Sequence, residues 1–233
     1  MIPKIIHCFW AQGPKTKLAE KCLASWRRFA PDWEIREWSL GDLLAEAKRR
    51  GETLPPFVTG AIAAKKWAFV SDWARFKVLY ENGGVYFDLD AELLKSIDEL
   101  PEGEWVSGEW RANGRVGMNP GGGLALEKGS PVASAMLAYY GKVTFGGKKT
   151  VGEIMDDLQS EGVEIRVLSP EVTNPIGVDG KVRRTDKTVG IHWYAMSWAS
   201  PKQKILQWLS WHGFRPAIDT LLKVKRALAG RGS

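Results

Sequence analysis

The chain has 233 residues, of which 44% are hydrophobic and 26% are charged, proportions that exclude a disordered or fibrous protein. Its two cysteines, Cys8 and Cys22, exclude a disulfide framework and a cysteine-based metal site. The N-terminal sequence has the pattern of neither a signal peptide nor a membrane span, so we expect the protein in the cytoplasm.

The net charge of +6 is concentrated at the C-terminal end. Residues 201–233 contain seven Lys or Arg and one Asp, and Ile205, Trp208, Leu209 and His212 recur there at helical spacing. We expect a basic amphipathic helical extension that either packs on the domain or lies peripherally on the inner face of an anionic membrane. Because this charge forms a tail without a recognised motif, no nucleic acid partner is expected.

The first 51 residues predict alternating strands and helices. A β-rich run over 4–10 is followed by a helical pattern that ends before Pro31, and a second strand is expected over 33–38. Ser39 and Asp42 then form a capping-box pattern that begins a helix, which Gly51 ends. This order indicates an α/β fold, in which ligand sites lie beyond the carboxyl ends of the strands.

The segment 65–90 predicts a helix that leads directly into a strand. No Gly or Pro interrupts residues 65–81, and aromatic residues recur there every three or four positions. After Gly83 and Gly84, residues 85–90 alternate, so Tyr86, Asp88 and Asp90 should face the same side of a strand. Further along, we expect strands over 105–110, 124–126 and 163–168, a helix over 131–140 and a flexible loop over 119–123.

Asp88 and Asp90 are the strongest candidates for chemistry. Two carboxylates on one strand face repel each other, and a bound divalent cation relieves the repulsion. Oxygen ligands select hard ions such as Mg²⁺ or Mn²⁺, whose coordination shell phosphate oxygens of a substrate commonly complete. An Asp-x-Asp pair also occurs as solvent-facing residues at strand ends, and this alternative stays open.

Asp72 and Arg75 precede this pair on one face of the predicted helix. Their spacing allows a surface ion pair that contributes roughly 0.2 to 0.5 kcal/mol. It equally allows two groups that hydrogen-bond sugar hydroxyls.

Three segments together resemble the family 32 glycosyltransferases, whose sugar-binding region contains a DXD motif. They are IPKIIHCFW, SDWARFKVLYENGGVYFDLD and IHWYAMSW, which occur in the expected order between Ile2 and Trp198. The resemblance implies a GT-A-like nucleotide-sugar-binding fold over 1–200, with a mixed, mainly parallel central sheet and flanking helices. It also implies a Mn²⁺ or Mg²⁺ cofactor and transfer of a hexose, with retention of anomeric configuration, from a UDP- or GDP-sugar donor to a glycan or lipid-linked glycan acceptor.

The resemblance also assigns roles to individual residues. Asp72 and Arg75 would hold the donor sugar, Trp10 would flank the base, and Tyr86 would support the nucleotide. Asp88 would contact ribose and metal, and Asp90 would ligate the metal directly. His192, Ser197 and Trp198 would reach the diphosphate or metal from a closing loop, with His192 counted among the metal ligands, and Asn119 would contact the donor. A His in an apolar strand is also commonly a hydrogen-bonded core residue.

Two other functions share some of these features. A lectin-like, metal-dependent carbohydrate-binding module without transferase activity would use the same carboxylates and would have no affinity for UDP or GDP. A metal-dependent phosphohydrolase would need further His or acidic ligands, and the chain has only three His.

Overall fold

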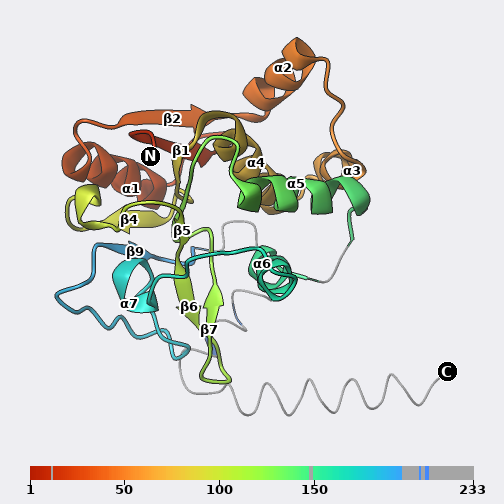
Figure 1. Ribbon diagram of the computed structural model, residues 1–233. Coiled ribbons are helices and arrows are strands. Elements are labelled where there is room, and N and C mark those ends of the chain that lie inside the picture. The colour runs from red at the N-terminus through yellow and green to blue at the C-terminus, as the bar shows by residue number, and fades with distance from the viewer. Residues whose placement is uncertain (12, 147–148, 196–204, 206–207, 210–233) are drawn as a thin grey trace, which may run out of the picture.

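The computed structural model describes residues 1–11, 13–146, 149–195, 205 and 208–209 (Figure 1). The strands in this part of the chain are β1 (Ile5–Phe9), β2 (Glu34–Trp38), β3 (Gly84–Tyr86), β4 (Ala91–Leu93), β5 (Trp105–Val106), β6 (Gly108–Trp110), β7 (Val116–Met118), β8 (Leu124–Leu126) and β9 (Gly190–His192). The helices are α1 (Lys17–Phe29), α2 (Leu40–Arg50), α3 (Pro56–Ala63), α4 (Trp67–Asn82), the 3₁₀ helix η1 (Ile97–Glu99), α5 (Pro131–Lys142), α6 (Val151–Ser160) and α7 (Pro170–Thr173).

The central sheet has the strand order β2-β1-β3-β8-β5. Strand β1 is parallel to both β2 and β3, whereas β8 is antiparallel to β3 and to β5. Four of the five strands therefore run in one direction. This confirms the predicted mixed, mainly parallel α/β sheet. Two small antiparallel pairs, β4 with β9 and β6 with β7, complete the strands.

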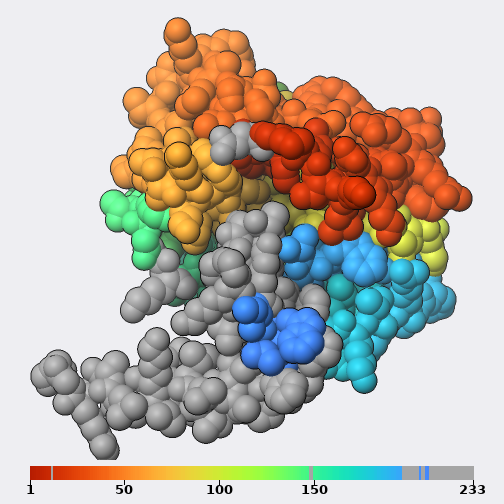
Figure 2. All heavy atoms as spheres, turned by 180° about the vertical axis from the view of Figure 1, so that it is seen from behind, coloured from red at the N-terminus to blue at the C-terminus, as the bar shows by residue number. Residues whose placement is uncertain are grey.

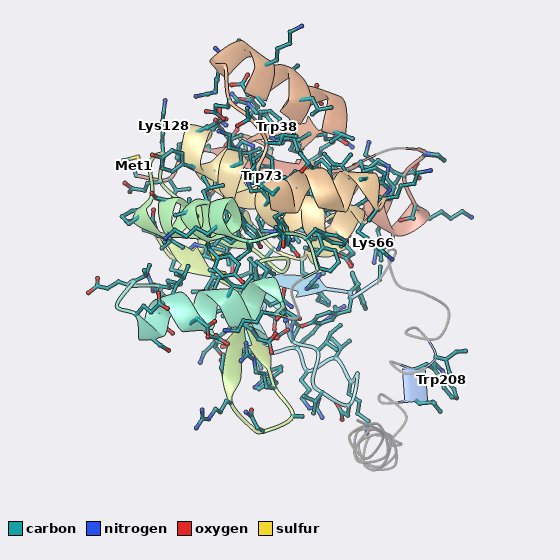
Figure 3. The ribbon with its side chains drawn as sticks, turned by 90° about the vertical axis from the view of Figure 1, so that its right-hand side faces the viewer. Met1, Trp38, Lys66, Trp73, Lys128 and Trp208 are labelled. Atoms are coloured by element: carbon teal, nitrogen blue, oxygen red, sulfur yellow. The ribbon has the colours of Figure 1, made fainter. Side chains whose placement is uncertain are left out.

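Helices cover both faces of this sheet (Figure 1). On one face, the side chains of Tyr86 and Leu124 pack in a cluster with α3, α4 and α5. The same cluster contains Trp73 of α4 and packs against Trp38 of β2 (Figure 3). On the other face, Val85 packs with residues of α1. The alternation of side chains along β3 thus supplies both halves of the core.

Local signals in the sequence correctly marked several helix ends. The Ser39 hydroxyl accepts from the Asp42 backbone N–H, and the Asp42 carboxylate accepts from the Ser39 N–H, which completes the capping box. Gly51 ends α2 in the left-handed conformation, with φ of 66°. Gly84 follows α4 with φ of 112°, and a Cβ there would lie 2.5 Å from the Ile5 carbonyl oxygen. Glycine at position 84 therefore permits the close approach of β3 to β1.

The predicted strand over 85–90 is wrong beyond Tyr86. The Ala91 N–H donates to the Asp88 carbonyl at 2.9 Å, which closes a turn over 88–91. The chain then continues as β4, which pairs with β9 outside the central sheet. Asp88 and Asp90 consequently lie on a tight turn at the end of β3 rather than within a strand.

Two other predicted strands differ from the observed structure. The run over 105–110 divides at Ser107, because the Ser107 N–H bonds to Gly123 and the Ser107 carbonyl accepts from the Asn119 N–H. Strand β5 therefore joins the central sheet while β6 pairs with β7. The run over 163–168 forms only an isolated bridge from Val167 to Val106.

The predicted extension over 201–233 lies almost entirely outside the described residues. Within it, the side chains of Ile205 and Trp208 are exposed. Across the described part of the chain, no helix combines the length and the apolar character needed to cross a membrane.

Candidate functional site

A cavity of about 610 Å³ lies beyond the carboxyl ends of β1 and β3. Its lining includes Trp10, Asp72, Arg75, Asp88, Asp90, Asn119 and His192 from the set predicted by sequence. Residues near position 190 reach this region from the far end of the described chain and lie below the N-terminal elements (Figure 2). The fold thus gathers residues from distant segments at the sheet edge where α/β proteins bind ligands.

Asp88, Asp90 and His192 form the centre of the site. One ligand atom from each residue lies within 4.8 Å of those of the other two. The pairing of β4 with β9 sets Ala91 opposite His192, which places the imidazole beside the Asp90 carboxylate. Nε2 of His192 lies 3.1 Å from Oδ1 of Asp90.

The charges of Asp90 and His192 stabilise each other. Burial by itself would lower the pKa of His192, but the Asp90 carboxylate raises it above its ordinary value. Burial would likewise raise the pKa of Asp90, yet His192 and the Ala195 N–H, which donates to Oδ2 at 2.8 Å, hold it below the ordinary value. The pair therefore keeps Asp90 ionised.

The three residues fit a divalent cation. Two carboxylates and one imidazole are a donor set that such ions accept in proteins. Nδ1 of His192 is buried and has no hydrogen-bond partner among the described residues. A buried polar atom without a partner is uncommon, and a bound ion or water would remove this deficit.

Asp72, Arg75 and Asp88 form a second charged group beside the first. Nη2 of Arg75 lies 3.0 Å from Oδ1 of Asp72 and 3.3 Å from Oδ1 of Asp88. The Arg75 side chain is only 4% exposed. Burial raises the pKa of Asp72 to about 6, and the Arg75 charge opposes this rise. The ion pair allowed by the spacing is therefore present, but it is not a surface pair, because Arg75 is buried and joins two carboxylates.

Trp10 and Tyr86 occupy different positions relative to the cavity. The Trp10 indole lines it and donates through Nε1 to the Gly13 carbonyl at 2.9 Å. Tyr86 is buried behind the lining, where its hydroxyl lies 2.9 Å from Oγ of Ser71 and the Arg75 guanidinium lies 5.2 Å from its ring centre. Tyr86 thus supports Arg75, which itself faces the cavity.

Asn119 lines the opposite wall and is held by its side chain. Its Nδ2 donates to Oε2 of Glu109 at 2.9 Å and to the Tyr194 hydroxyl at 3.0 Å, while its Oδ1 accepts from the Gly121 N–H at 3.1 Å. The predicted loop over 119–123 is therefore fixed at this point. Ser197 and Trp198 lie outside the described residues.

Sequence reasoning did not identify Glu109 and Tyr194, which complete this wall. The Tyr194 ring centre lies 4.4 Å from that of His192, and its hydroxyl lies 2.5 Å from Nδ2 of Asn174. Tyr194 has φ of 50°, a conformation that non-glycine residues rarely adopt. The sequence placed Tyr194 near His192, but it contained no signal for these contacts with segments around residues 109 and 174.

A second cavity of about 720 Å³ lies between β8 and the segment 162–166. None of the residues predicted for the site contributes to its lining. The candidate chemistry therefore belongs to the first cavity.

Part of the chain matches a known sequence family, and its fold is similar to those of solved glycosyltransferase structures. Residues 16–106 match the family model described as a glycosyltransferase sugar-binding region containing a DXD motif. This range includes Asp72, Arg75, Asp88 and Asp90 but not His192. The structure is similar to that of the PaToxG glycosyltransferase, with a TM-score of 0.51, 20% identity, and coverage of 69% of this chain and 70% of that one. It is also similar to a glycosyltransferase involved in glycosylation of the major capsid of PBCV-1, with a TM-score of 0.52, 12% identity, and coverage of 89% of this chain and 100% of that one.

No curated protein sequence was found to match the chain. The chain thus has a GT-A-like fold, and its residues 16–106 match the model of a DXD-containing glycosyltransferase sugar-binding region.

Proposed function

We propose that the protein is a metal-dependent glycosyltransferase that moves a hexose from a UDP- or GDP-sugar to a glycan or lipid-linked glycan. The observation that carries the proposal is the convergence of Asp88, Asp90 and His192 in the cavity that also holds Asp72 and Arg75. The cavity of about 610 Å³ lies within the range of small-ligand sites. The match to a DXD-containing family model supports the same conclusion.

In this proposal Asp88, Asp90 and His192 hold Mn²⁺ or Mg²⁺. A bound cation of this kind would neutralise charge that builds on the departing diphosphate. Asp72 accepts hydrogen bonds from hydroxyls of the donor sugar, and Arg75 donates to its oxygens. Because Arg75 is buried and held by Asp72, it presents its guanidinium without further ordering.

The walls of the cavity supply the remaining donor contacts. Trp10, which directly follows β1, flanks the base with the indole that lines the cavity, since flat aromatic rings stack on nucleobases. Asn119, whose amide is fixed by Glu109 and Tyr194, contacts the diphosphate or the sugar. Ser197 and Trp198, to which the family resemblance assigns contacts with the diphosphate or metal, lie outside the described residues.

We further propose membership of family 32 and transfer with retention of anomeric configuration. Both rest on the three sequence segments that resemble this family. In a retaining transfer without a protein base, a leaving phosphate oxygen takes the acceptor proton on the face where the new bond forms. NMR of the first product formed tests retention, and a glycosyl ester trapped on Asp72 would contradict the direct transfer.

Binding of nucleotides with and without metal tests the function itself. We expect isothermal titration calorimetry to show that UDP or GDP, and one of their sugars, binds in Mn²⁺ and binds at least about 10-fold more weakly in EDTA. Incubation should then release free nucleotide. Carbohydrate binding without affinity for either nucleotide would instead identify the lectin-like module.

The basic C-terminal region supports a separate proposal about location. We propose that residues 201–233 hold the protein at the inner, anionic face of the cytoplasmic membrane, because this segment contains seven basic residues and only one acidic residue. Wild-type protein should co-sediment with vesicles containing phosphatidylserine at low salt. The triple variant Lys223→Glu, Lys225→Glu and Arg226→Glu should remain in the supernatant. No sedimentation of the wild type would contradict the proposal.

A further inference from the structure

We infer that Glu109 binds and orients the acceptor hydroxyl in the transfer reaction. This inference rests on the proposed function. It concerns the acceptor substrate, for which the sequence indicated no binding residue.

Glu109 is a carboxylate of the cavity wall. It lies in the middle of β6 and lines the same cavity as Asp72, Arg75 and both aspartates of the turn. Its cross-strand neighbour on β7 is Gly117, over which the Arg111 guanidinium lies. Glu109 thus faces the space that both substrates would share.

One carboxylate oxygen of Glu109 is held firmly in place. Oε2 accepts from Nδ2 of Asn119 at 2.9 Å and from the Tyr194 hydroxyl at 3.2 Å. The hydroxyl of Tyr194 is fixed in turn by the buried Asn174 at 2.5 Å. These contacts limit the rotation of the carboxylate, as the orientation of a reactant requires.

The other oxygen, Oε1, has no hydrogen-bond partner among the described residues. The nearest cation is Arg111, whose Nε lies 3.9 Å away, beyond hydrogen-bond distance. The Arg111 guanidinium also pairs with Asp156, at 2.6 Å. Oε1 is therefore available to a ligand, and the Glu109 side chain is 30% exposed.

Glu109 differs in this respect from the other carboxylates that line the cavity. Asp72 and Asp88 both lie against the Arg75 guanidinium, and Asp90 lies against His192. The hydrogen-bond donors of Glu109 are neutral groups, an amide and a phenol. Its ion pair with Arg111, at 3.9 Å, is longer than those of Asp72, Asp88 and Asp90.

A carboxylate oxygen in this position suits an alcohol. The acceptor hydroxyl donates its hydrogen to Oε1, which directs an oxygen lone pair toward the anomeric carbon of the bound donor. The new bond then forms between this oxygen and the anomeric carbon as the bond to the diphosphate breaks. As the bond to the diphosphate breaks, the hydroxyl hydrogen changes its hydrogen-bond acceptor from Oε1 to the leaving phosphate oxygen, which takes the proton. No covalent bond of Glu109 is made or broken.

The test compares Glu109→Gln with Glu164→Gln in the full chain. The amide oxygen of Gln still accepts from Asn119 and Tyr194, but its NH₂ group replaces the free acceptor oxygen. Glu164→Gln is the control, because it makes the same chemical change at an exposed residue that does not line this cavity. Each protein is mixed with Mn²⁺ and the UDP- or GDP-sugar that binds the wild type. The measurements are donor Kd, nucleotide release with water as acceptor, and glycoside formed with added glycerol.

We expect Glu109→Gln to lower nucleotide release and glycoside formation by about 10- to 100-fold, because a hydrogen bond to a charged group is lost. Its donor Kd should stay within about twofold of the wild type. Glu164→Gln should match the wild type in every measurement. In Glu109→Ala, sodium formate should restore part of the nucleotide release, because it supplies a carboxylate to the space left behind.

Two outcomes overturn the inference. If Glu109→Gln turns over like the wild type while Glu109→Ala loses thermal stability, Glu109 has only a structural role toward Asn119 and Tyr194. If Glu109→Gln loses donor affinity, the residue belongs to the donor site. A wild type that binds no nucleotide in Mn²⁺ would instead contradict the proposed function, so the two failures are distinguishable.

Discussion

Oδ1 of Asp90 lies 3.1 Å from Nε2 of His192, although the two residues are far apart in the sequence. Strand β9 carries His192. Its pairing with β4 places His192 opposite Ala91, the residue after Asp90. The same segment returns to the aspartate twice more. The Trp193 N–H donates to the Asp90 carbonyl, and the Ala195 N–H donates to its carboxylate. The proposed metal site and the path of the segment around residue 193 therefore meet at Asp90.

The first prediction concerns Asp90→Asn. We expect this change to lower Mn²⁺-dependent nucleotide release by at least about 100-fold, because it removes a charged ligand of the proposed metal site. Circular dichroism should show an intact fold. Asp186→Asn, which makes the same substitution at an exposed position, should retain wild-type activity. Full metal-dependent turnover by Asp90→Asn would refute the assignment.

A second prediction follows from the pKa of His192. The Asp90 carboxylate raises this pKa above the ordinary 6.5, whereas burial alone would lower it. In metal-free Asp90→Asn the burial remains and the carboxylate charge is gone, so the pKa of His192 should fall below 6.5. NMR titration of the imidazole resonances measures this directly. If the pKa stays above 6.5, Asp88 rather than Asp90 dominates the electrostatics of His192.

The third prediction uses two glycines that differ in their surroundings. A Cβ at Gly121 would lie 2.3 Å from Oδ2 of Asp88, whereas a Cβ at Gly141 on α5 would meet no atom within 4 Å. Gly121→Ala should therefore displace the Asp88 carboxylate and weaken Mn²⁺-dependent donor binding by at least about 10-fold. Gly141→Ala should leave binding unchanged and stabilise the protein by roughly 0.5 to 1 kcal/mol. Calorimetry and thermal unfolding distinguish the two effects, and equal donor affinities would show that Asp88 does not contribute to the site.

A fourth prediction concerns the buried charge of Arg75. Arg75→Met leaves Asp72 and Asp88 without their shared cation, and breaking such a buried pair costs roughly 3 to 5 kcal/mol of folding free energy. Urea unfolding should show this loss, together with weaker donor binding. Arg49→Met, at a position 65% exposed on α2, should change stability by less than about 0.5 kcal/mol. Similar stabilities for the two variants would mean that the carboxylates near Arg75 are solvated.

The fifth prediction is a pH dependence that originates outside the active site. His7 is buried in β1, where its Nδ1 accepts from Nε1 of Trp38 at 2.9 Å and its Nε2 donates to the Gly83 carbonyl at 2.9 Å. These bonds use the neutral imidazole, and burial lowers the pKa of His7 from 6.5 to about 4. The unfolded chain thus binds the proton more readily between these values. The stability contributed above pH 6.5 should decrease as pH falls toward 4, by about 3 kcal/mol.

Urea unfolding from pH 7 to pH 4 measures this dependence. His7→Gln cannot titrate, and it should lose less stability over the same range than the wild type. Because the carboxylates titrate in both proteins, the difference between the two curves isolates His7. Parallel curves would contradict the assignment.

The sequence alone predicted features that depend on neighbouring residues. The helix expected over 65–81 is α4, and the capping box at Ser39 begins α2, because periodicity and capping act within a few turns of the chain. The alternation after Gly84 correctly placed Asp88 and Asp90 at the end of β3. It did not predict the turn at these residues, since the N–H of Ala91 bonds back to Asp88 and β4 leaves the central sheet.

Only the tertiary structure placed Glu109 and Tyr194 at the site. Tyr194 meets Asn119 and Asn174 through one hydroxyl, and no local pattern connects these positions. Its left-handed backbone is held by these distant contacts rather than by its own preference. Local sequence determined the helices, several strands and the acidic pair, because periodicity and capping act over short stretches of the chain. The pairing of β4 with β9 and the hydrogen bonds of the Tyr194 hydroxyl join residues 109, 119 and 174 to a segment far along the chain, so this wall of the cavity was visible only in the folded molecule.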